Sequence, residues 1–220
     1  MFISHRRIGK RSGKHFGFTL IEILTVMAIM GIIVGLTVPA SMSSIRSSRL
    51  TMGVTTLIGQ INLARQVAIT QNCQVEVRFY QYGDSAEGEN ATQPLTGKFR
   101  SIQLVKYTDT GTYVPLGKLE HLPSGVILDQ GTQISSIFNL GNGIKAGSAA
   151  YGSIPKVGTN YNFIAFRFLA DGSTNLYPAS SSWFLTFHDA HNGDSLAALP
   201  SNYFTVQIDS ANGHVKTYRP

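Results

Sequence analysis

The feature that most constrains this chain is a run of 24 residues near its amino terminus that is almost entirely apolar. The run extends from Gly17 to Ala40, contains no Lys, Arg or Asp, and includes Glu22 as its only ionisable side chain. About 20 apolar residues in a helix are enough to cross the hydrocarbon core of a membrane. Because the run is apolar on every side rather than along one stripe, it suits lipid better than the surface of a soluble domain. The sequence therefore predicts a transmembrane helix over residues 18–40.

Basic residues are concentrated before this run, and they predict its orientation. Five of them lie within the first 17 residues, whereas only Arg46 and Arg49 follow the run closely. Since cytoplasmic segments carry the excess of Lys and Arg, we expect the amino terminus in the cytoplasm and the chain beyond residue 45 outside it. The whole chain has 18 Lys and Arg against 12 acidic residues, so removing these five leaves 13 against 12. A general surface for nucleic acid is therefore not expected.

The junction between the basic leader and the apolar run carries a specific motif. Residues 14–22 read Lys-His-Phe-Gly-Phe-Thr-Leu-Ile-Glu, which resembles the prepilin processing site of type IV pilins and type II secretion pseudopilins. The resemblance implies that prepilin peptidase, a membrane aspartic peptidase, removes the leader 1–17 by cutting between Gly17 and Phe18, and that the amine of Phe18 is then methylated. It also implies assembly with other pseudopilins or pilins on an inner-membrane platform. A conventional secretory signal would be cut after the apolar run, where Ala40-Ser41-Met42 is a poor site.

Glu22 is an expensive residue to place in a membrane segment. An unpaired carboxylate at the centre of a spanning helix costs about 2–3 kcal/mol or more, so it calls for a partner. The amine freed at Phe18 is one turn away, on the same chain or on a neighbour, and opposite charges attract strongly in a low dielectric. The resemblance favours the neighbour's amine and gives Glu22, with Thr19, a role in assembly. The alternative is a carboxylate that extends to the membrane interface.

Three residues within the run weaken a helix, namely Gly31, Gly35 and Pro39. Proline lacks an amide donor and crowds the preceding turn. In assembled type IV pili the corresponding stretch melts, and the resemblance implies that this segment can loosen in the same way. An isolated subunit is equally compatible with a continuous helix.

Beyond the run, apolar residues recur at intervals of four and three, which predicts an amphipathic continuation of the helix over residues 41–73. The chain's own sheet is the expected partner of this stripe, because an exposed stripe promotes aggregation. Residues 57–79, with Leu122–Val126, Phe168–Ser173 and Gly213–Lys216, resemble minor pseudopilin H and the FimT-like minor pilins. The stripe consists of Leu50, Val54, Leu57, Ile61, Ala64 and Ala68.

Residues 74–220 read as short strands separated by glycine-rich turns. The clearest hairpin turn is Ser210–Gly213. Residues 83–97 and 139–160 read as long loops, either flexible connections or surfaces that select a partner. The expected fold is α+β and pilin-like, with a long amino-terminal helix packed on an exported antiparallel sheet. We expect strands at residues 74–82, 98–107, 112–116, 125–129, 161–169, 182–188, 202–208 and 214–219.

Motifs typical of hydrolases, metalloproteases and nucleotide-binding proteins are absent, so we expect no enzymatic activity and no cofactor. Residues 188–194 nevertheless include five potential metal ligands. Calcium would use Asp189, Asn192 and Asp194, and zinc would use His188 and His191. Neither spacing matches an established loop, and such residues are common in turns.

Two further features have both a structural and a functional interpretation. His214, Lys216 and Arg219 make a basic carboxyl end that could contact nucleic-acid phosphates, although alternating basic residues more often protect an edge strand. Cys73 is the only cysteine, which excludes an intrachain disulfide; a small buried thiol is the expected state, and pairing with another chain is the alternative.

Three functions remain open on the sequence alone. The first is a non-enzymatic structural subunit, a minor pseudopilin of a type II secretion pseudopilus, held in the bacterial inner membrane with its sheet domain in the periplasm. The second is a minor pilin of a type IV pilus, used in adhesion, motility or DNA uptake. The third is a periplasmic binding module whose leader is an uncut membrane anchor.

Overall fold

The computed structural model describes residues 17–90, 96–108, 110–139, 144–155, 157–177 and 182–220. The chain divides into two compact units, residues 1–43 and residues 44–220. One helix, α1 (Leu20–Thr70, 51 residues), contributes to both units, which are treated separately below. All of the predicted leader except Gly17 lies outside the described residues.

The first unit consists, in its described part, of residues 17–19 and the apolar beginning of α1. The helix continues through Gly31, Gly35 and Pro39 without a break. Every side chain from residue 20 to residue 37 is exposed, as expected for a helix without its lipid or helical neighbours. Within the part of the chain that the structure describes, α1 is the one helix long and apolar enough to cross a membrane.

Helix α1 ends at Thr70, three residues before the predicted limit of 73, and Asn72 accounts for the difference. Asn72 has a positive φ of 48°. The N–H of Cys73 donates to the carbonyl of Ala68 (3.1 Å), and the N–H of Asn72 donates to the carbonyl of Ile69 (3.4 Å). This pair of bonds is the Schellman motif, whose left-handed residue is usually Gly and sometimes Asn. The backbone is thereby turned directly into the first strand.

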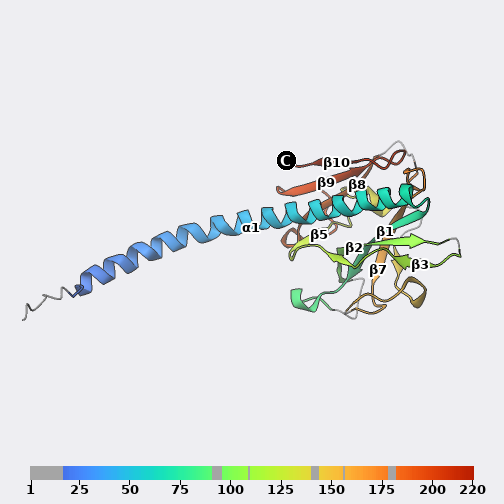
Figure 1. The fold of residues 1–220 in the computed structure, drawn as a ribbon. Coiled ribbons are helices and arrows are strands. Elements are labelled where there is room, and N and C mark those ends of the chain that lie inside the picture. Colours follow the sequence, from blue (N-terminus) through green and yellow to red (C-terminus); the bar gives the residue numbers. More distant parts are fainter. Residues whose placement is uncertain (1–16, 91–95, 109, 140–143, 156, 178–181) are drawn as a thin grey trace, which may run out of the picture. The chain divides into compact units, whose positions relative to one another are not determined.

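The second unit contains an antiparallel sheet that is ten-stranded in the described residues. Its main path has the order β10-β9-β8-β5-β2-β1-β7-β6, and β3 and β4 both pair with β2. Figure 1 shows the carboxyl-terminal part of α1 lying along this sheet. The strands are β1 (Gln74–Tyr82), β2 (Lys98–Tyr107), β3 (Tyr113–Pro115), β4 (Glu120–His121), β5 (Val126–Leu128), β6 (Lys145–Ala146), β7 (Asn162–Phe168), β8 (Trp183–Asp189), β9 (Tyr203–Ile208) and β10 (Val215–Tyr218).

The main hydrophobic core lies between α1 and one face of the sheet. All six residues of the predicted stripe, Leu50 to Ala68, are at most 2% exposed. They form one cluster with apolar side chains of β1, β2, β5, β7, β8 and β9. Complete burial of a large aliphatic side chain contributes about 1.5–3 kcal/mol, so this stripe is the main attachment of the helix to the sheet.

The opposite face of the sheet is covered as well, by part of the segment that was predicted to be a long loop. Ile154 of that segment, together with Tyr161 just after it, packs there against Tyr80, Tyr82 and Phe163. Large apolar side chains on both faces explain why β1 is buried over nearly its whole length. Ile154 is thus buried on the sheet, whereas most of the other described residues of 139–160 are half-buried or exposed, and a flexible connection or a surface that selects a partner stays a prediction for them.

A buried ion pair holds this cover in place. Arg78 is 1% exposed, and its Nε donates to Glu76 Oε1 at 2.6 Å. Its Nη1 donates to the carbonyl of Tyr151 at 3.1 Å. The guanidinium carbon also lies 4.4 to 5.3 Å from the ring centroids of Tyr113, Tyr151 and Phe163. Cation–π contacts are strongest when they are desolvated, as they are here.

The α+β fold predicted from the sequence is confirmed. All eight predicted strands are present, with ends that agree within one residue. The two strands that were missed, β4 and β6, have two residues each and no periodic pattern to reveal them. Cys73 is free and half-buried, and it packs at the margin of the main core.

Candidate processing and assembly site

The predicted cleavage bond lies in a short irregular segment immediately before α1. Residues 17–19 have no regular secondary structure. A Cβ added to Gly17 would meet no atom within 4 Å, and Phe18 is 79% exposed. No described residue covers the bond between them. A peptidase would therefore meet an accessible backbone without first unfolding the helix.

Thr19 and Glu22 form a reciprocal pair of hydrogen bonds at the start of the helix. Thr19 Oγ1 accepts from the N–H of Glu22 at 3.3 Å. In return, Glu22 Oε2 accepts from the N–H of Thr19 at 3.3 Å and from its hydroxyl at 3.4 Å. The carbonyl of Thr19 receives the first helical bonds, from Glu22 and Ile23. This arrangement is a capping box, in which Thr19 is the N-cap and Glu22 the third helical residue.

The capping box places a carboxylate beside the backbone nitrogen that follows Phe18. Cleavage after Gly17 would create an amine one residue before the N–H that Glu22 already contacts. A negative charge in the first helical turn also complements the positive end of the helix dipole. The geometry therefore holds Glu22 ready to pair with a cation at the amino end of a helix, either its own or that of a neighbour.

The capping role of Thr19 is a feature that the sequence analysis missed. Its signal was present, because Thr or Ser followed three residues later by Glu is the sequence signature of a capping box. The motif was interpreted through cleavage and assembly only. Both roles use the same two side chains, so one does not exclude the other.

Two of the helix-weakening residues, Gly31 and Gly35, lie on an exposed part of α1. An added Cβ at Gly31 or Gly35 would meet no atom within 4 Å. Pro39 has no N–H to give to the carbonyl of Gly35, so one helical bond is absent even though the helix continues. The hydroxyl of the nearby Thr37 donates to the carbonyl of Ile33 at 3.0 Å, within the same turns of the helix. Loosening of this segment in a filament stays a prediction.

The candidate metal ligands of residues 188–194 are directed to different partners. His188 is fully buried, and its Nε2 lies 2.8 Å from Asp129 Oδ2. Asp189 Oδ1 caps a short 3₁₀ turn by accepting from the N–H of His191 at 2.9 Å. Asp194 accepts from Gln130. Among the described residues, no group of three or more His, Cys, Asp or Glu is placed to hold a metal ion.

The ionisation of these carboxylates follows their surroundings. Burial opposes the charge of Asp189, but hydrogen bonds from His191 and the charge of Arg46 outweigh it and lower the pKa of Asp189. Burial raises the pKa of Asp194, because its hydrogen bonds are not enough to offset the loss of solvent. The pKa values of these two carboxylates are thus shifted in opposite directions by local causes, hydrogen bonds and charge at Asp189 and burial at Asp194. Asn192 lies exposed in the same turn.

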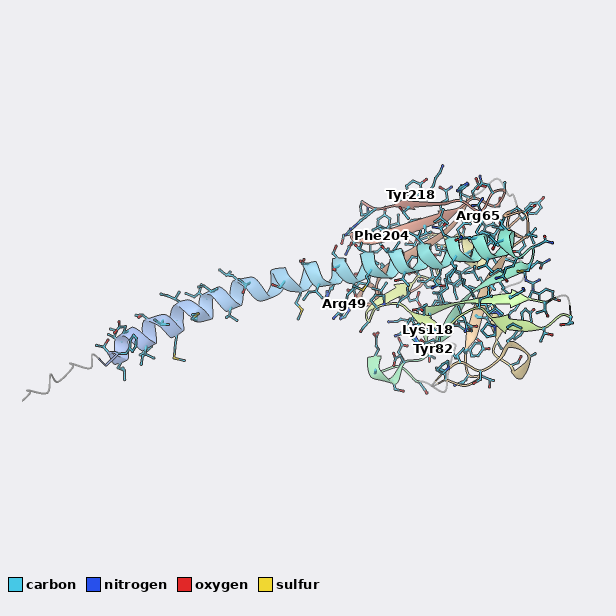
Figure 2. The ribbon with its side chains drawn as sticks, viewed as in Figure 1. Arg49, Arg65, Tyr82, Lys118, Phe204 and Tyr218 are labelled. Carbon is cyan, nitrogen blue, oxygen red and sulfur yellow. The ribbon has the colours of Figure 1, made fainter. Side chains whose placement is uncertain are left out.

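The three basic residues at the carboxyl end have different surroundings, because two are exposed to solvent and the third contacts α1. His214 and Lys216 are exposed. Arg219, in contrast, donates to Ser47 Oγ at 2.5 Å and to Thr51 Oγ1 at 3.3 Å. Its guanidinium lies 4.9 Å from the ring of Phe204, a residue of β9 that is labelled in Figure 2. Arg219 thus joins the last strands to α1, which leaves two of the three candidate nucleic-acid contacts without such a structural role.

One of three comparisons with known proteins bears on the amino-terminal segment. Residues 13–38 match a family described as the prokaryotic N-terminal methylation motif. No curated protein matches the chain. Among solved structures, the chain is similar to the minor pseudopilin EpsH from the Type 2 Secretion System of Vibrio cholerae, with 12% identity, coverage of 78% of this chain and 98% of that chain, and a TM-score of 0.42. The motif match confirms the prepilin-type resemblance first identified over residues 14–22.

Proposed function

We propose that this chain is a structural, non-enzymatic subunit, a minor pseudopilin of a type II secretion pseudopilus. Prepilin peptidase cuts it between Gly17 and Phe18 and the new amine is methylated. Residues 18–40 hold the subunit in the bacterial inner membrane, with the amino terminus in the cytoplasm and residues 74–220 in the periplasm. An inner-membrane assembly platform then packs it, helix to helix, with other pseudopilins.

One observation carries this proposal: an exposed Gly-Phe bond followed by a capped, membrane-length helix with a single carboxylate in its first turn. An ordinary membrane anchor needs only the apolar helix. The methylation motif over residues 13–38 adds the processing chemistry. The choice of a pseudopilus over a pilus rests on a resemblance to minor pseudopilin H. This resemblance covers residues 57–79, Leu122–Val126, Phe168–Ser173 and Gly213–Lys216.

Glu22 has a defined part in the proposed assembly. In the single chain its carboxylate accepts hydrogen bonds from Thr19. During assembly it exchanges one of them for the methylated amine of a neighbouring Phe18, and the attraction between the two charges is large where water is scarce. Each incoming subunit is thereby drawn to the depth at which its amine meets a carboxylate that is already in the filament.

A minor pilin of a type IV pilus is the second candidate, because the same amino-terminal motif serves both assemblies. Neighbouring genes separate the two, since a retraction ATPase indicates pili. A membrane-anchored binding module is the third candidate, and it predicts an uncut chain without filament partners.

Mass analysis of the amino terminus from native membranes tests the processing step. We expect a chain that begins with methylated Phe18. A chain that still begins with Met1 would contradict assembly and favour the anchor.

Variants of Glu22 test the assembly step separately. Glu22→Gln preserves the capping box, because glutamine satisfies the same hydrogen bonds, but it removes the charge. Glu22→Leu removes both. We expect both variants to insert and to be cleaved, and neither to co-purify with other filament subunits. Normal co-purification of Glu22→Gln would show that capping is sufficient, and the proposed charge pairing would be wrong.

A further inference from the structure

Three tyrosine rings with a cation at each end form a strip on the face of the sheet opposite to α1. The ring centroids of Tyr151 and Tyr113 are 5.6 Å apart, and those of Tyr113 and Tyr107 are 5.3 Å apart. At one end, Lys145 Nζ lies 6.0 Å from the centroid of Tyr151. At the other end, the guanidinium carbon of Arg167 lies 4.8 Å from the centroid of Tyr107. All five side chains are half-buried, belong to the unit of residues 44–220, and are called the basic aromatic strip below.

The strip has more positive than negative charge, because one carboxylate serves two guanidinium groups. Glu76 Oε1 accepts from Arg78 Nε at 2.6 Å, and Glu76 Oε2 accepts from Arg167 Nε at 2.8 Å. Among the described residues, no other carboxylate pairs with either arginine. Lys145 forms no ion pair in the described part of the chain. Three cations against one carboxylate therefore leave two positive charges uncompensated.

The groups beneath the strip do not supply the missing negative charge. Arg78 is 1% exposed, and its Nη2 has no hydrogen-bond partner among the described residues. Burial raises the pKa of Tyr113, so its hydroxyl is neutral at pH 7. A buried cation that is only partly compensated is unfavourable. An anion beside Arg167 would therefore lower the energy of both guanidinium groups.

Both ends of the strip have donors that an anion can use. The side chain of Arg167 is 26% exposed. Its Nε bonds to Glu76 and its Nη2 lies 3.4 Å from the hydroxyl of Tyr113, whereas its Nη1 forms no hydrogen bond to a described residue. The ammonium of Lys145 has three donors and lies only against aromatic rings. A guanidinium presents its donors in a fork that matches a carboxylate.

The packing of the rings indicates which kind of anionic partner fits. Proteins that hold single-stranded nucleic acid stack bases on open aromatic faces. Here a guanidinium lies 4.4 Å from the centroid of Tyr113, and another lies 4.8 Å from that of Tyr107. Each of these rings also meets its neighbour at an angle of 52° or 53°. Such half-buried rings offer little area to a base, but a carboxylate needs only the cations at the two ends.

The spacing of the two cations suits an extended peptide. Lys145 of β6 is paired with Phe163 of β7, which lies four residues before Arg167 on the same strand. Four residues of a strand span about 13 Å. In an extended peptide, residues four positions apart have this separation and point to the same side. In addition, β6 is the last strand of the main path, and no described strand pairs with its outer edge.

We propose that the basic aromatic strip binds an extended acidic segment of a partner protein, in which two carboxylates lie four residues apart. One carboxylate pairs with Lys145 and the other with Arg167, while the residues between them cover the tyrosine rings. This interaction depends neither on cleavage after Gly17 nor on membrane insertion, so it is independent of the proposed function.

Fluorescence anisotropy with the full-length chain in a neutral detergent tests the binding. The probe is a peptide with capped ends, Glu-Thr-Val-Thr-Glu, that carries an uncharged dye. The control peptide has Gln in place of both Glu residues. We expect the control peptide to bind at least about tenfold more weakly than the acidic one, and the affinity of the acidic peptide to decrease with salt. Equal affinity for the two peptides, or no binding of the acidic peptide, would overturn the proposal.

Variants of the strip locate the binding site. Lys145→Gln and Arg167→Gln should each weaken binding of the acidic peptide by about fivefold to tenfold. Lys106→Gln removes the same charge from the α1 side of the sheet and should change the affinity less than about twofold. Because Arg167→Gln also removes a partner of Glu76, the fluorescence of Trp183, the only tryptophan, checks that this variant is folded. If it is not folded, Lys145→Gln decides alone, and equal weakening by Lys145→Gln and Lys106→Gln would place the site elsewhere.

An oligothymidine labelled with the same dye tests the competing class of ligand. We expect it to bind no more tightly than the control peptide at physiological salt. If oligothymidine instead binds more tightly than the acidic peptide, and Lys145→Gln weakens that binding, the strip is a nucleic-acid site and the acidic segment is the wrong partner.

Discussion

At the scale of single residues, both ends of α1 are set by side chains that satisfy free backbone groups. Thr19 and Glu22 cap the beginning, and Asn72 closes the end by adopting a left-handed backbone. A helix end without such partners leaves several N–H or C=O groups unsatisfied. The limits of the helix therefore depend on individual residues rather than on overall helix propensity.

Asn72 offers a test of this account. A left-handed conformation costs most residues about 1–2 kcal/mol, and Gly and Asn less. We therefore expect Asn72→Ala to lower the free energy of unfolding by about 1 kcal/mol, and Asn72→Gly to leave it unchanged or raise it. Denaturant unfolding of the full chain in detergent, followed by Trp183 fluorescence, measures both. Asn62→Ala, an exposed change within the helix, is the control and should be neutral or slightly stabilising.

At the scale of elements, the turn between β9 and β10 is attached to α1 by a hydrogen bond from a side chain to the backbone, and it packs closely on the turn after β7. Arg65 Nε donates to the carbonyl of Asn212 at 2.8 Å. A Cβ added to Gly213 would lie 2.6 Å from Phe168 Cε1 and 2.7 Å from the carbonyl oxygen of Gly172. Two turns that are distant in sequence therefore meet beside Arg65, which is labelled on α1 in Figure 2, and a side chain at Gly213 would separate them.

A pair of glycine variants tests this packing. Gly213 has a positive φ of 67° and no free space, so Gly213→Ala should cost at least about 2 kcal/mol from backbone strain and overpacking together. Gly59 lies exposed within α1 and has no atom within 4 Å of an added Cβ. Gly59→Ala should stabilise by up to about 1 kcal/mol, through helix propensity. Thermal unfolding of both variants in the same detergent should show shifts of opposite sign. Shifts of the same sign would contradict this description of the hairpin.

At the scale of the sheet domain, burial of polar side chains on the second face of the sheet links stability to pH. Burial raises the pKa of Tyr80 to about 12, from a usual value of 10.0. Its hydroxyl donates to Gln103 Oε1 at 3.1 Å. The folded state thus keeps this proton at a pH where the unfolded state loses it, so the stability present below pH 10 decreases as the pH rises toward 12.

This linkage predicts a specific difference between two tyrosine variants. In the unmodified chain, the titration of Tyr80 should lower the free energy of unfolding by about 1.4 kcal/mol for each pH unit between pH 10 and 12. Tyr80→Phe has no hydroxyl to titrate at this position, so its free energy of unfolding should fall less steeply over the same pH range. At neutral pH, the lost hydrogen bond should cost about 1 kcal/mol. Tyr218, which is 51% exposed and also donates to a glutamine, Gln207, is the matched control. Denaturant unfolding at several pH values checks both, and an unchanged slope in Tyr80→Phe would contradict the prediction.

Much of the architecture follows from patterns that are local in the sequence. The spanning run, the processing motif and the stripe from Leu50 to Ala68 depend on the order of residues within a few turns of one helix. The strands likewise depend on short alternating segments between turns. Neighbouring residues determine such patterns, so they can be read without knowledge of the partner. The confirmed strand limits and the buried stripe illustrate this.

The tertiary structure alone decided which distant residues meet. It pairs Glu76 of β1 with Arg167 of β7, places a bulge in the β1 and β2 pairing near Tyr80, and brings Arg46 to Asp189. These contacts join residues that no local period relates, and each depends on strand order and on the chain's path between strands. The amino-terminal motif was therefore determined by the sequence itself, whereas the covered sheet exists only because folding assembles separated segments.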